Sequence, residues 1–171
     1  MKIRKLHDKD ALYMMEWMKD ENVNRFFRFN SEQVTMESVL EFIKSSANIV
    51  DSYHFAIADD NDEYLGTVSL KNVDAISKNG EYAISLRACA QGKGAGKFAT
   101  EQILLFAFNE LNLERVYLNV LSDNEHAVLF YKKIGFTYEG EFYRHINLRG
   151  ELKSLMWFRM MKSEYGKFYD K

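Results

Sequence analysis

The most informative segment of the sequence is glycine-rich and reads Gln91, Gly92, Lys93, Gly94, Ala95 and Gly96. It follows a predicted strand at 81–87 and opens an amphipathic run that predicts a helix to about Glu110. Glycine lets a backbone approach phosphate oxygens closely, and the free N–H groups at a helix N-terminus attract anions. The stretch therefore predicts a phosphate-binding turn, although a glycine-rich turn without a ligand would show the same pattern.

Two common phosphate-binding signatures do not fit this spacing. A P-loop requires a glycine at position 91 and Ser or Thr at position 98, where the chain has Gln91 and Phe98. A dinucleotide-binding fingerprint requires a third glycine at position 97, which is Lys97. The spacing therefore disfavours a mononucleotide-binding α/β domain.

Hydrophobic periodicity on either side of this turn predicts a mixed α/β (α+β) domain. Strands are expected at 3–6, 53–58, 64–70, 81–87, 116–120, 136–147 and 151–161. Helices are expected from Asp8 and Thr35, after Gly96, and from about Asn124 to Gly135, with Leu12, Met15 and Met18 on the buried face of the first. Alternation of strand and helix from 81 to 144 predicts a mainly parallel centre with an antiparallel hairpin at each edge. No linker or repeat divides residues 1–171, which predicts a single domain.

Composition excludes several classes of protein. The 23 Lys+Arg and 25 Asp+Glu give a net charge of -2, which argues against a nucleic-acid binder. Cys89 is the single cysteine, so an internal disulfide and a cysteine-based zinc site are excluded, and we expect it to be a buried small residue. No apolar run is long enough for a secretory signal or a membrane span, and no His, Asp and Glu spacing is typical of a metal site. We therefore expect a cytoplasmic protein without metal, membrane or nucleic-acid partners.

A second motif occupies residues 124–136, which read Asn-Glu-His-Ala-Val-Leu-Phe-Tyr-Lys-Lys-Ile-Gly-Phe. The first and second motifs together resemble the GNAT (GCN5-related) N-acetyltransferases. That family shows Gln or Arg, two residues, Gly, one residue and Gly or Ala, a pattern met by Gln91, Gly94 and Gly96. Its second pattern, Asn-x-x-Ala-x-x-x-Tyr-x-x-x-Gly-Phe, is met from Asn124 to Phe136.

The resemblance extends over nearly the whole chain. It implies a GNAT-like mixed, centrally splayed sheet of seven strands flanked by about four helices. The segments 140–142 (Gly-Glu-Phe) and 149–151 (Arg-Gly-Glu) resemble the branch of ribosomal-protein N-terminal, spermidine and some nucleotide-sugar acetyltransferases. The function implied is transfer of an acetyl group from acetyl-CoA directly to a primary amine.

This chemistry requires an acid for the leaving thiolate and a route for the amine proton. Tyrosine, with a pKa of about 10, stays protonated at neutral pH and can protonate a thiolate whose pKa is about 8.5. The resemblance implies that Tyr131 is this acid, whereas its apolar neighbours also fit a packing role. Glu81 at the start of the fourth strand is the candidate base acting through water, or an ordinary strand-start carboxylate.

The resemblance also implies which residues bind acetyl-CoA. Main-chain amides of residues 91–96 are expected at the pyrophosphate, and the backbone of Ile84, Ser85 and Leu86 at the pantetheine arm. Asn124 is expected to cap its helix and contact the same arm. Lys133 is expected either at the phosphates or in solvent.

The acceptor site is expected between the early helices and the last hairpin. Its candidate residues are Phe27, Glu32, Tyr143 and His145, although an aromatic cluster around Phe27 is also typical of a core. A protein N-terminus, a polyamine and an amino sugar remain open as acceptors, and Glu32, Glu37 and Glu41 are few acids for a polyamine. The resemblance leaves a homodimer open, and the alternative function is a catalytically silent acyl-CoA sensor or association domain.

Overall fold

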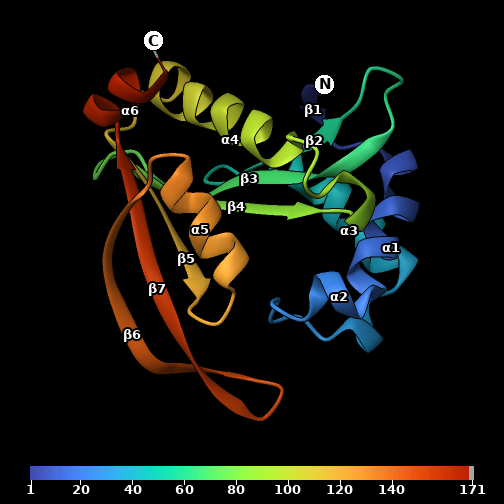
Figure 1. Cartoon of the computed structure of the whole chain (residues 1–171). Helices are drawn as coiled ribbons and strands as arrows, with labels where there is room; N and C mark the ends of the chain where they lie inside the picture. The colour runs from blue at the N-terminus through green and yellow to red at the C-terminus, as the bar shows by residue number, and fades with distance from the viewer. Residues whose placement is uncertain (170–171) are drawn as a thin grey trace.

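A seven-stranded mixed sheet in the order β1-β2-β3-β4-β5-β7-β6 organises the computed structural model, which describes residues 1–169 (Figure 1). Its strands are β1 (Lys2–Lys5), β2 (Tyr53–Ala58), β3 (Tyr64–Asp74), β4 (Asn79–Leu86), β5 (Arg115–Leu121), β6 (Thr137–Leu148) and β7 (Glu151–Met161). The helices in this part of the chain are α1 (Ala11–Lys19), α2 (Glu21–Asn24), α3 (Met36–Ser46), α4 (Ala95–Leu105), α5 (Glu125–Lys133) and α6 (Lys162–Tyr169). The seven-stranded sheet is confirmed, and the short α2 and the C-terminal α6 are added to the four helices expected.

The expectation of a mainly parallel centre is wrong. Among the described strands only β4 and β5 pair in parallel, while β5–β7 and β6–β7 are antiparallel. The crossover through α5 does give β6 the direction of β5. However, β7 returns from the hairpin turn and lies between them, so β5 and β6 are not neighbours.

The parallel pair is short, and this splits the sheet. Its register comprises Asn79–Arg115, Gly80–Val116 and Glu81–Tyr117, although β4 continues to Leu86 and β5 to Leu121. In Figure 1 the two strands diverge at a wide angle, and the twisted β6–β7 hairpin extends away from the other strands. The central splay is therefore confirmed.

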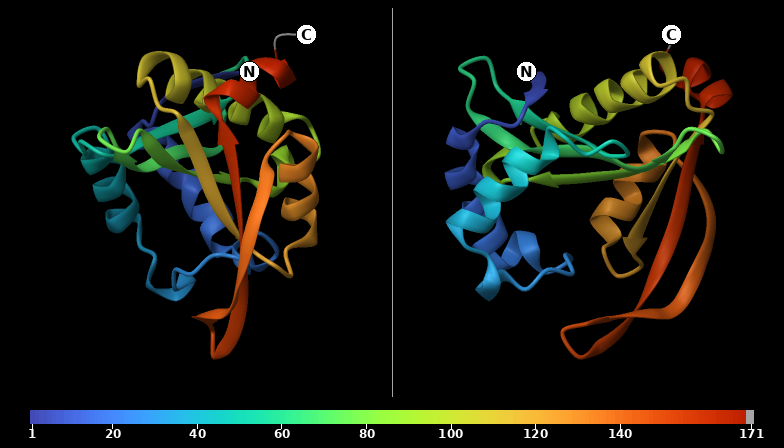
Figure 2. Two further views of the ribbon diagram at one scale, coloured as in Figure 1. Left: turned by 90° about the vertical axis from the view of Figure 1, so that its left-hand side faces the viewer. Right: turned by 180° about the vertical axis from the view of Figure 1, so that it is seen from behind.

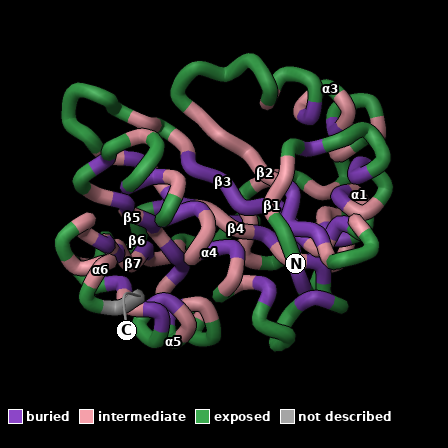
Figure 3. Tube along the Cα trace, turned by 90° about the horizontal axis from the view of Figure 1, so that it is seen from above, coloured by how far each residue is buried: buried purple, intermediate pink, exposed green. Residues whose placement is uncertain are grey.

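The helices cover both faces of the sheet. One buried cluster joins β2–β5 and β7 to α4 and α5, and another joins β2 and β3 to α1 and α3. Ile57 belongs to the first cluster and Ala56 to the second, as expected for neighbouring residues of one strand. Figure 2 shows α3 and α5 on opposite faces, and Figure 3 shows the buried segments between them with exposed loops around the outside.

The buried face of α1 differs from the one that the sequence predicted. Ala11, Met14 and Trp17 are buried, and Met15 and Met18 are half-buried against the same cluster, whereas Leu12 is 69% exposed. Both sets have three-residue spacing, so periodicity alone does not choose between them. Tertiary contacts do: the Trp17 indole nitrogen donates to the Tyr64 hydroxyl at 3.2 Å.

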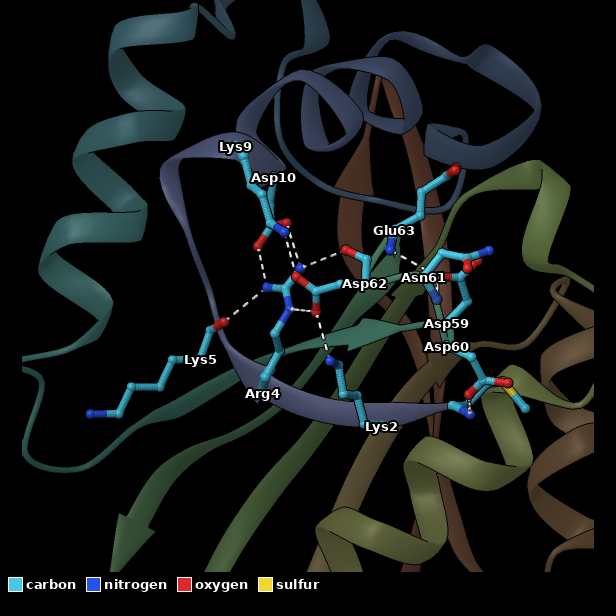
Figure 4. A network of polar contacts seen from close by, with 11 residues as sticks. Lys2, Arg4, Lys5, Lys9, Asp10, Asp59, Asp60, Asn61, Asp62 and Glu63 are labelled. Carbon is cyan, nitrogen blue, oxygen red and sulfur yellow. Dashed lines mark hydrogen bonds and ion pairs between the residues drawn. The ribbon is translucent and has the colours of Figure 1, made fainter.

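An ion-pair network anchors the N-terminal strand (Figure 4). Arg4 of β1 donates to the buried Asp10 at 2.7 and 2.9 Å and to Asp62 at 2.7 Å. Lys2 and Lys9 also form ion pairs with Asp62, and these cations hold the pKa of that carboxyl far below its usual value. The network therefore joins β1 and the turn before α1 to the β2–β3 turn. Within residues 1–169, none of the helices combines the length and apolarity needed to cross a membrane.

Candidate active site

The glycine segment forms an exposed turn between β4 and α4. Gly92 and Gly94 have φ values of 72° and 86°, and a Cβ at either position would meet nothing within 4 Å. Gly94 is the N-cap of α4 and provides no capping side chain. The first backbone N–H groups of α4 are therefore open to an anion.

Gly96 brings this turn close to the end of β4 and to α5. A Cβ on Gly96 would lie 3.4 Å from Cζ of Phe130 and 3.5 Å from Cδ1 of Leu86. Gln91, Gly92, Lys93 and Gly94 are exposed, whereas Ala95 is only 1% exposed. The turn is thus fixed by its buried end while its other residues face solvent.

Tyr131 lies in α5 behind the splay and is 8% exposed. Its ring packs against Tyr82 of β4 and Phe136, both at 5.9 Å between centroids, and against Phe158 at 6.3 Å. Within residues 1–169 its hydroxyl has no hydrogen-bond partner. Burial raises the pKa of Tyr131 well above its usual value, so the hydroxyl keeps its proton across the neutral range.

Glu81 is the last residue of β4 that pairs with β5, and its side chain is 18% exposed. Its Oε1 accepts from Nζ of Lys71 at 3.3 Å and from Nδ2 of Asn119 at 3.4 Å. Its Oε2 accepts from Nδ2 of Asn72 at 2.8 Å. Side chains of β3 and β5 therefore hold the Glu81 carboxylate of β4 at the point where β4 and β5 begin to separate.

The two candidate catalytic residues lie on opposite faces of β4. Tyr82 points toward α5 and contacts Tyr131, so the preceding residue, Glu81, points to the other face. The strands β4 and β5 cease to pair just after Glu81. A group placed in the splay would have the carboxylate on one side and the tyrosine on the other.

The expected pantetheine residues lie along the free edge of β4. Ser85 and Leu86 pair with β3 on one side, as does Ile84. On the β5 side, pairing within residues 1–169 ends at Glu81. The backbone of this half of β4 is therefore available to an extended ligand.

Asn124 and Lys133 occupy opposite ends of α5. The Asn124 side chain caps the helix by accepting from the N–H of Ala127 at 3.3 Å, which confirms the expected cap. Lys133 is exposed in the last turn. The remainder of their expected roles, contact with acetyl-CoA, stays a prediction.

Cys89 is exposed, so the expectation of a buried cysteine is wrong. It lies in a single 3-10 turn, Ala88–Ala90, in which Ala90 takes the inward position at 2% exposed. A buried charged residue of this region is Arg87, whose guanidinium donates to both carboxylate oxygens of Glu16 at 3.0 and 2.8 Å and to Glu63 at 2.6 Å. This clamp fixes α1 to the end of β4.

The four expected acceptor residues do not meet in one place. Glu32 lines a cavity of about 530 Å³ between the segment 21–32 and the hairpin tip. Phe27 packs instead on Trp17 and Phe29, at 5.3 and 5.8 Å between centroids. Tyr143 is 81% exposed on β6, and the exposed His145 packs edge-on to Phe142 at 5.0 Å.

Several residues of this region were missed in the sequence. Arg149 at the hairpin tip donates to Oδ1 of the buried Asn24 at 3.0 Å, which joins the tip to α2. Glu21 and Arg28 line the same cavity as Glu32. Asn72 and Asn119, which hold Glu81, were missed as well. The one signal for such residues in the sequence is a polar residue near the end of a predicted strand, as at Asn72, and this signal is weak.

Clusters of three or more His, Cys, Asp or Glu side chains with metal-binding geometry are absent from residues 1–169. The expectation that the chemistry needs no metal stays a prediction.

Comparison with known proteins gives a consistent assignment. The family model described as the acetyltransferase (GNAT) domain matches residues 1–137. Spermidine N(1)-acetyltransferase of Escherichia coli (strain K12) is 24% identical over 165 residues, covering 96% of this chain and 88% of that protein. A putative ribosomal N-acetyltransferase of Bacillus subtilis (strain 168) is 28% identical over 100 residues, covering 58% of this chain and 55% of that protein.

Solved structures show the same fold. A crystal structure of spermidine N-acetyltransferase from Vibrio cholerae in complex with CoA and spermine has a TM-score of 0.88 and 22% identity, and the match covers 96% of each chain. The matched family model includes the glycine turn, the splay and α5. With its signature turn, its splayed sheet and a family model that spans most of its length, the chain belongs to the GNAT acetyltransferase family.

Proposed function

We propose that this enzyme transfers the acetyl group of acetyl-CoA directly to a primary amine in the splay between β4 and β5. One observation carries the proposal: Glu81 and Tyr131 flank the point where β4 and β5 separate, on opposite faces of β4. A base on one side and an acid on the other is the arrangement that acyl transfer between a thioester and an amine requires.

The proposed reaction has two proton transfers. The amine nitrogen attacks the thioester carbonyl carbon, and its proton passes through a water molecule to the Glu81 carboxylate. The carbon–sulfur bond then breaks, and the leaving thiolate takes the proton of the Tyr131 hydroxyl. Burial keeps that hydroxyl protonated, which suits a general acid.

The residues of the glycine turn fit the diphosphate of acetyl-CoA. Gly92 and Gly94 leave open space where a side chain would stand, and the N-terminus of α4 offers free N–H groups and the positive end of its dipole. The end of β4 from Ala83 to Leu86, which has no partner strand on the β5 side, supplies backbone groups for the pantetheine arm. Asn124 and Lys133 extend the proposed binding surface along α5.

The acceptor that we place first is a polyamine such as spermidine. The Escherichia coli relative carries this activity in its name. In this chain, Glu21 and Glu32 line the 530 Å³ cavity, and within residues 1–169 neither forms an ion pair. Arg28 and Arg149 line it as well, so an amine that carries an anionic group is the competing acceptor. We place the reaction in the cytoplasm because the lone cysteine fits a reducing compartment.

The test is release of the CoA thiol from acetyl-CoA across spermidine, peptides with free N-termini, amino sugars and their nucleotide conjugates. Turnover of spermidine supports the polyamine proposal. Turnover of a different amine would support the assignment as an acetyltransferase and would exclude a polyamine as its acceptor. Acetyl-CoA binding measured by calorimetry without any turnover would favour the acyl-CoA sensor instead.

A pair of variants tests the acceptor site. Glu32→Gln is expected to raise KM for spermidine by about fivefold, because one ion pair near the surface contributes on the order of 1 kcal/mol. Glu37→Gln is the matched control, since Glu37 is an exposed acid in the first turn of α3 that does not line the cavity. Equal KM values in both variants would remove Glu32 from the acceptor site.

A further inference from the structure

A β-bulge lies in β3 beside Glu81. The β3–β4 register runs from Lys71–Glu81 directly to Asp74–Asn79, so Asn72 and Val73 stand opposite one residue of β4. Asn72 has a φ of 51°, in the left-handed region that few residues other than glycine and asparagine adopt. Bulges of this kind redirect a side chain out of the regular alternation of a strand.

The turn of this hairpin has hydrogen bonds of its own. The turn is closed by Asp74, whose Oδ1 accepts from the N–H groups of Ile76 and Ser77 at 2.8 and 2.9 Å. The side chain of Asn72 is directed elsewhere, with Nδ2 at 2.8 Å from Oε2 of Glu81. The unusual backbone of Asn72 therefore coincides with a contact to the proposed base.

The number of hydrogen bonds that the Glu81 carboxylate can accept shows what the contact from Asn72 controls. A carboxylate accepts at about four lone-pair positions. Lys71 and Asn119 occupy the two on Oε1, at 3.3 and 3.4 Å, and Asn72 occupies one on Oε2. The fourth position is on Oε2, so the shortest of the three contacts is to the oxygen atom that can still accept a proton.

We propose that Asn72 is a positioning residue that orients Glu81, so that the unoccupied lone pair of Oε2 faces the proton leaving the amine. Lys71 and Asn119 donate to Oε1, so the orientation of Oε2 depends on Asn72 in the bulge. This inference rests on the proposed function, because it assigns the proton-accepting role to Glu81. It adds a residue from β3, a strand that holds none of the predicted site residues.

The test uses Asn72→Gly, which removes the amide and leaves a residue that favours the left-handed backbone. With spermidine, or with the amine of the panel that is turned over fastest, kcat is expected to fall about 10- to 100-fold, as for a misplaced catalytic group. KM for acetyl-CoA and the melting temperature should stay at the wild-type values. The matched control is Asn112→Gly, at another exposed asparagine with a φ of 51°, and its kcat should not change.

A double-variant cycle separates this inference from the proposed function. If Glu81→Gln leaves kcat unchanged, or if no amine is turned over, both proposals fail. If Glu81→Gln lowers kcat and Asn72→Gly does not, only the role of Asn72 fails. Adding Asn72→Gly to Glu81→Gln should cause no further loss, because Asn72 acts through that carboxylate. An equal loss in both backgrounds would overturn the inference.

Discussion

Replacement of Tyr131 by phenylalanine removes one oxygen atom from the centre of the proposed site. The Tyr131 hydroxyl has no hydrogen-bond partner within residues 1–169, and the ring contacts with Tyr82, Phe136 and Phe158 do not involve it. No intramolecular hydrogen bond is lost, so Tyr131→Phe should change the free energy of unfolding by less than about 0.5 kcal/mol. The fold should therefore survive the substitution.

The expected effect on catalysis is much larger. General acid catalysis typically contributes about 10²- to 10⁴-fold, so kcat should fall by that factor, which corresponds to about 3–5 kcal/mol in the barrier. Affinity for acetyl-CoA should change little. Because burial raises the pKa of Tyr131, the wild-type kcat should show no decline from this group up to about pH 10, the usual tyrosine value.

Tyr82→Phe is the matched control. Tyr82 is 2% exposed, touches Tyr131, and shares a hydrogen bond of 2.8 Å with Oγ1 of Thr100. Its loss should lower the free energy of unfolding by about 1 kcal/mol, or the melting temperature by about 2–4 °C in a chain of this size. The activity per folded molecule should be close to that of the wild type.

The assays are urea unfolding and steady-state release of the CoA thiol at saturating acetyl-CoA. The predicted pattern is a stable, slow Tyr131→Phe and a less stable, active Tyr82→Phe. A Tyr131→Phe enzyme with kcat within twofold of wild type would refute the acid role. A large loss of stability in that variant would refute the conclusion that its hydroxyl is unpaired.

Three further predictions concern binding and stability. Gly94→Ala should weaken acetyl-CoA binding, measured by calorimetry, at least tenfold. Gly150, at the hairpin tip, also has a positive φ, of 90°, so an alanine at either position should cost about 1 kcal/mol in backbone strain. Gly150→Ala should nevertheless leave acetyl-CoA binding unchanged. Arg87→Lys should lower the free energy of unfolding in urea by about 1 kcal/mol, since a lysine cannot form the paired bonds to Glu16, and an unchanged midpoint would show that the clamp contributes little. In the N-terminal ion-pair network, Lys2, Arg4 and Lys9 lower the pKa of Asp62. The negative charge of Asp62 therefore stabilises the fold at neutral pH, and this stabilisation is lost as the pH falls below about 4. Asp62→Asn should flatten the acid side of the curve of melting temperature against pH, and an identical curve would contradict the network's role.

The features that the sequence predicted correctly depend on short-range physics. Gly92 and Gly94 need left-handed backbone, and Asn124 caps a helix three residues before its partner amide. Such requirements can be read from neighbouring residues alone. The family resemblance added the splay and the place of Tyr131 behind it.

The features that were missed depend on contacts between distant segments. The position of β7 between β5 and β6 follows from strand pairing, which has no local signature in the sequence. The buried face of α1 is decided by Trp17 meeting Tyr64, 47 positions further along the chain. Asn72 and Asn119 reach Glu81 from two other strands, and neither residue type is unusual where it stands.

The junction between β4 and β5 has three residue pairs in the described part of the chain, and it leaves the C-terminal end of β4 without a neighbouring strand on that side. Its opposing residues are Asn79–Arg115, Gly80–Val116 and Glu81–Tyr117, all at one end of the gap. Amides of β4 beyond Tyr82 that face the gap should exchange quickly with deuterium in the free protein. A bound cofactor arm would act there as an added strand, slowing that exchange by a factor set by its own binding free energy.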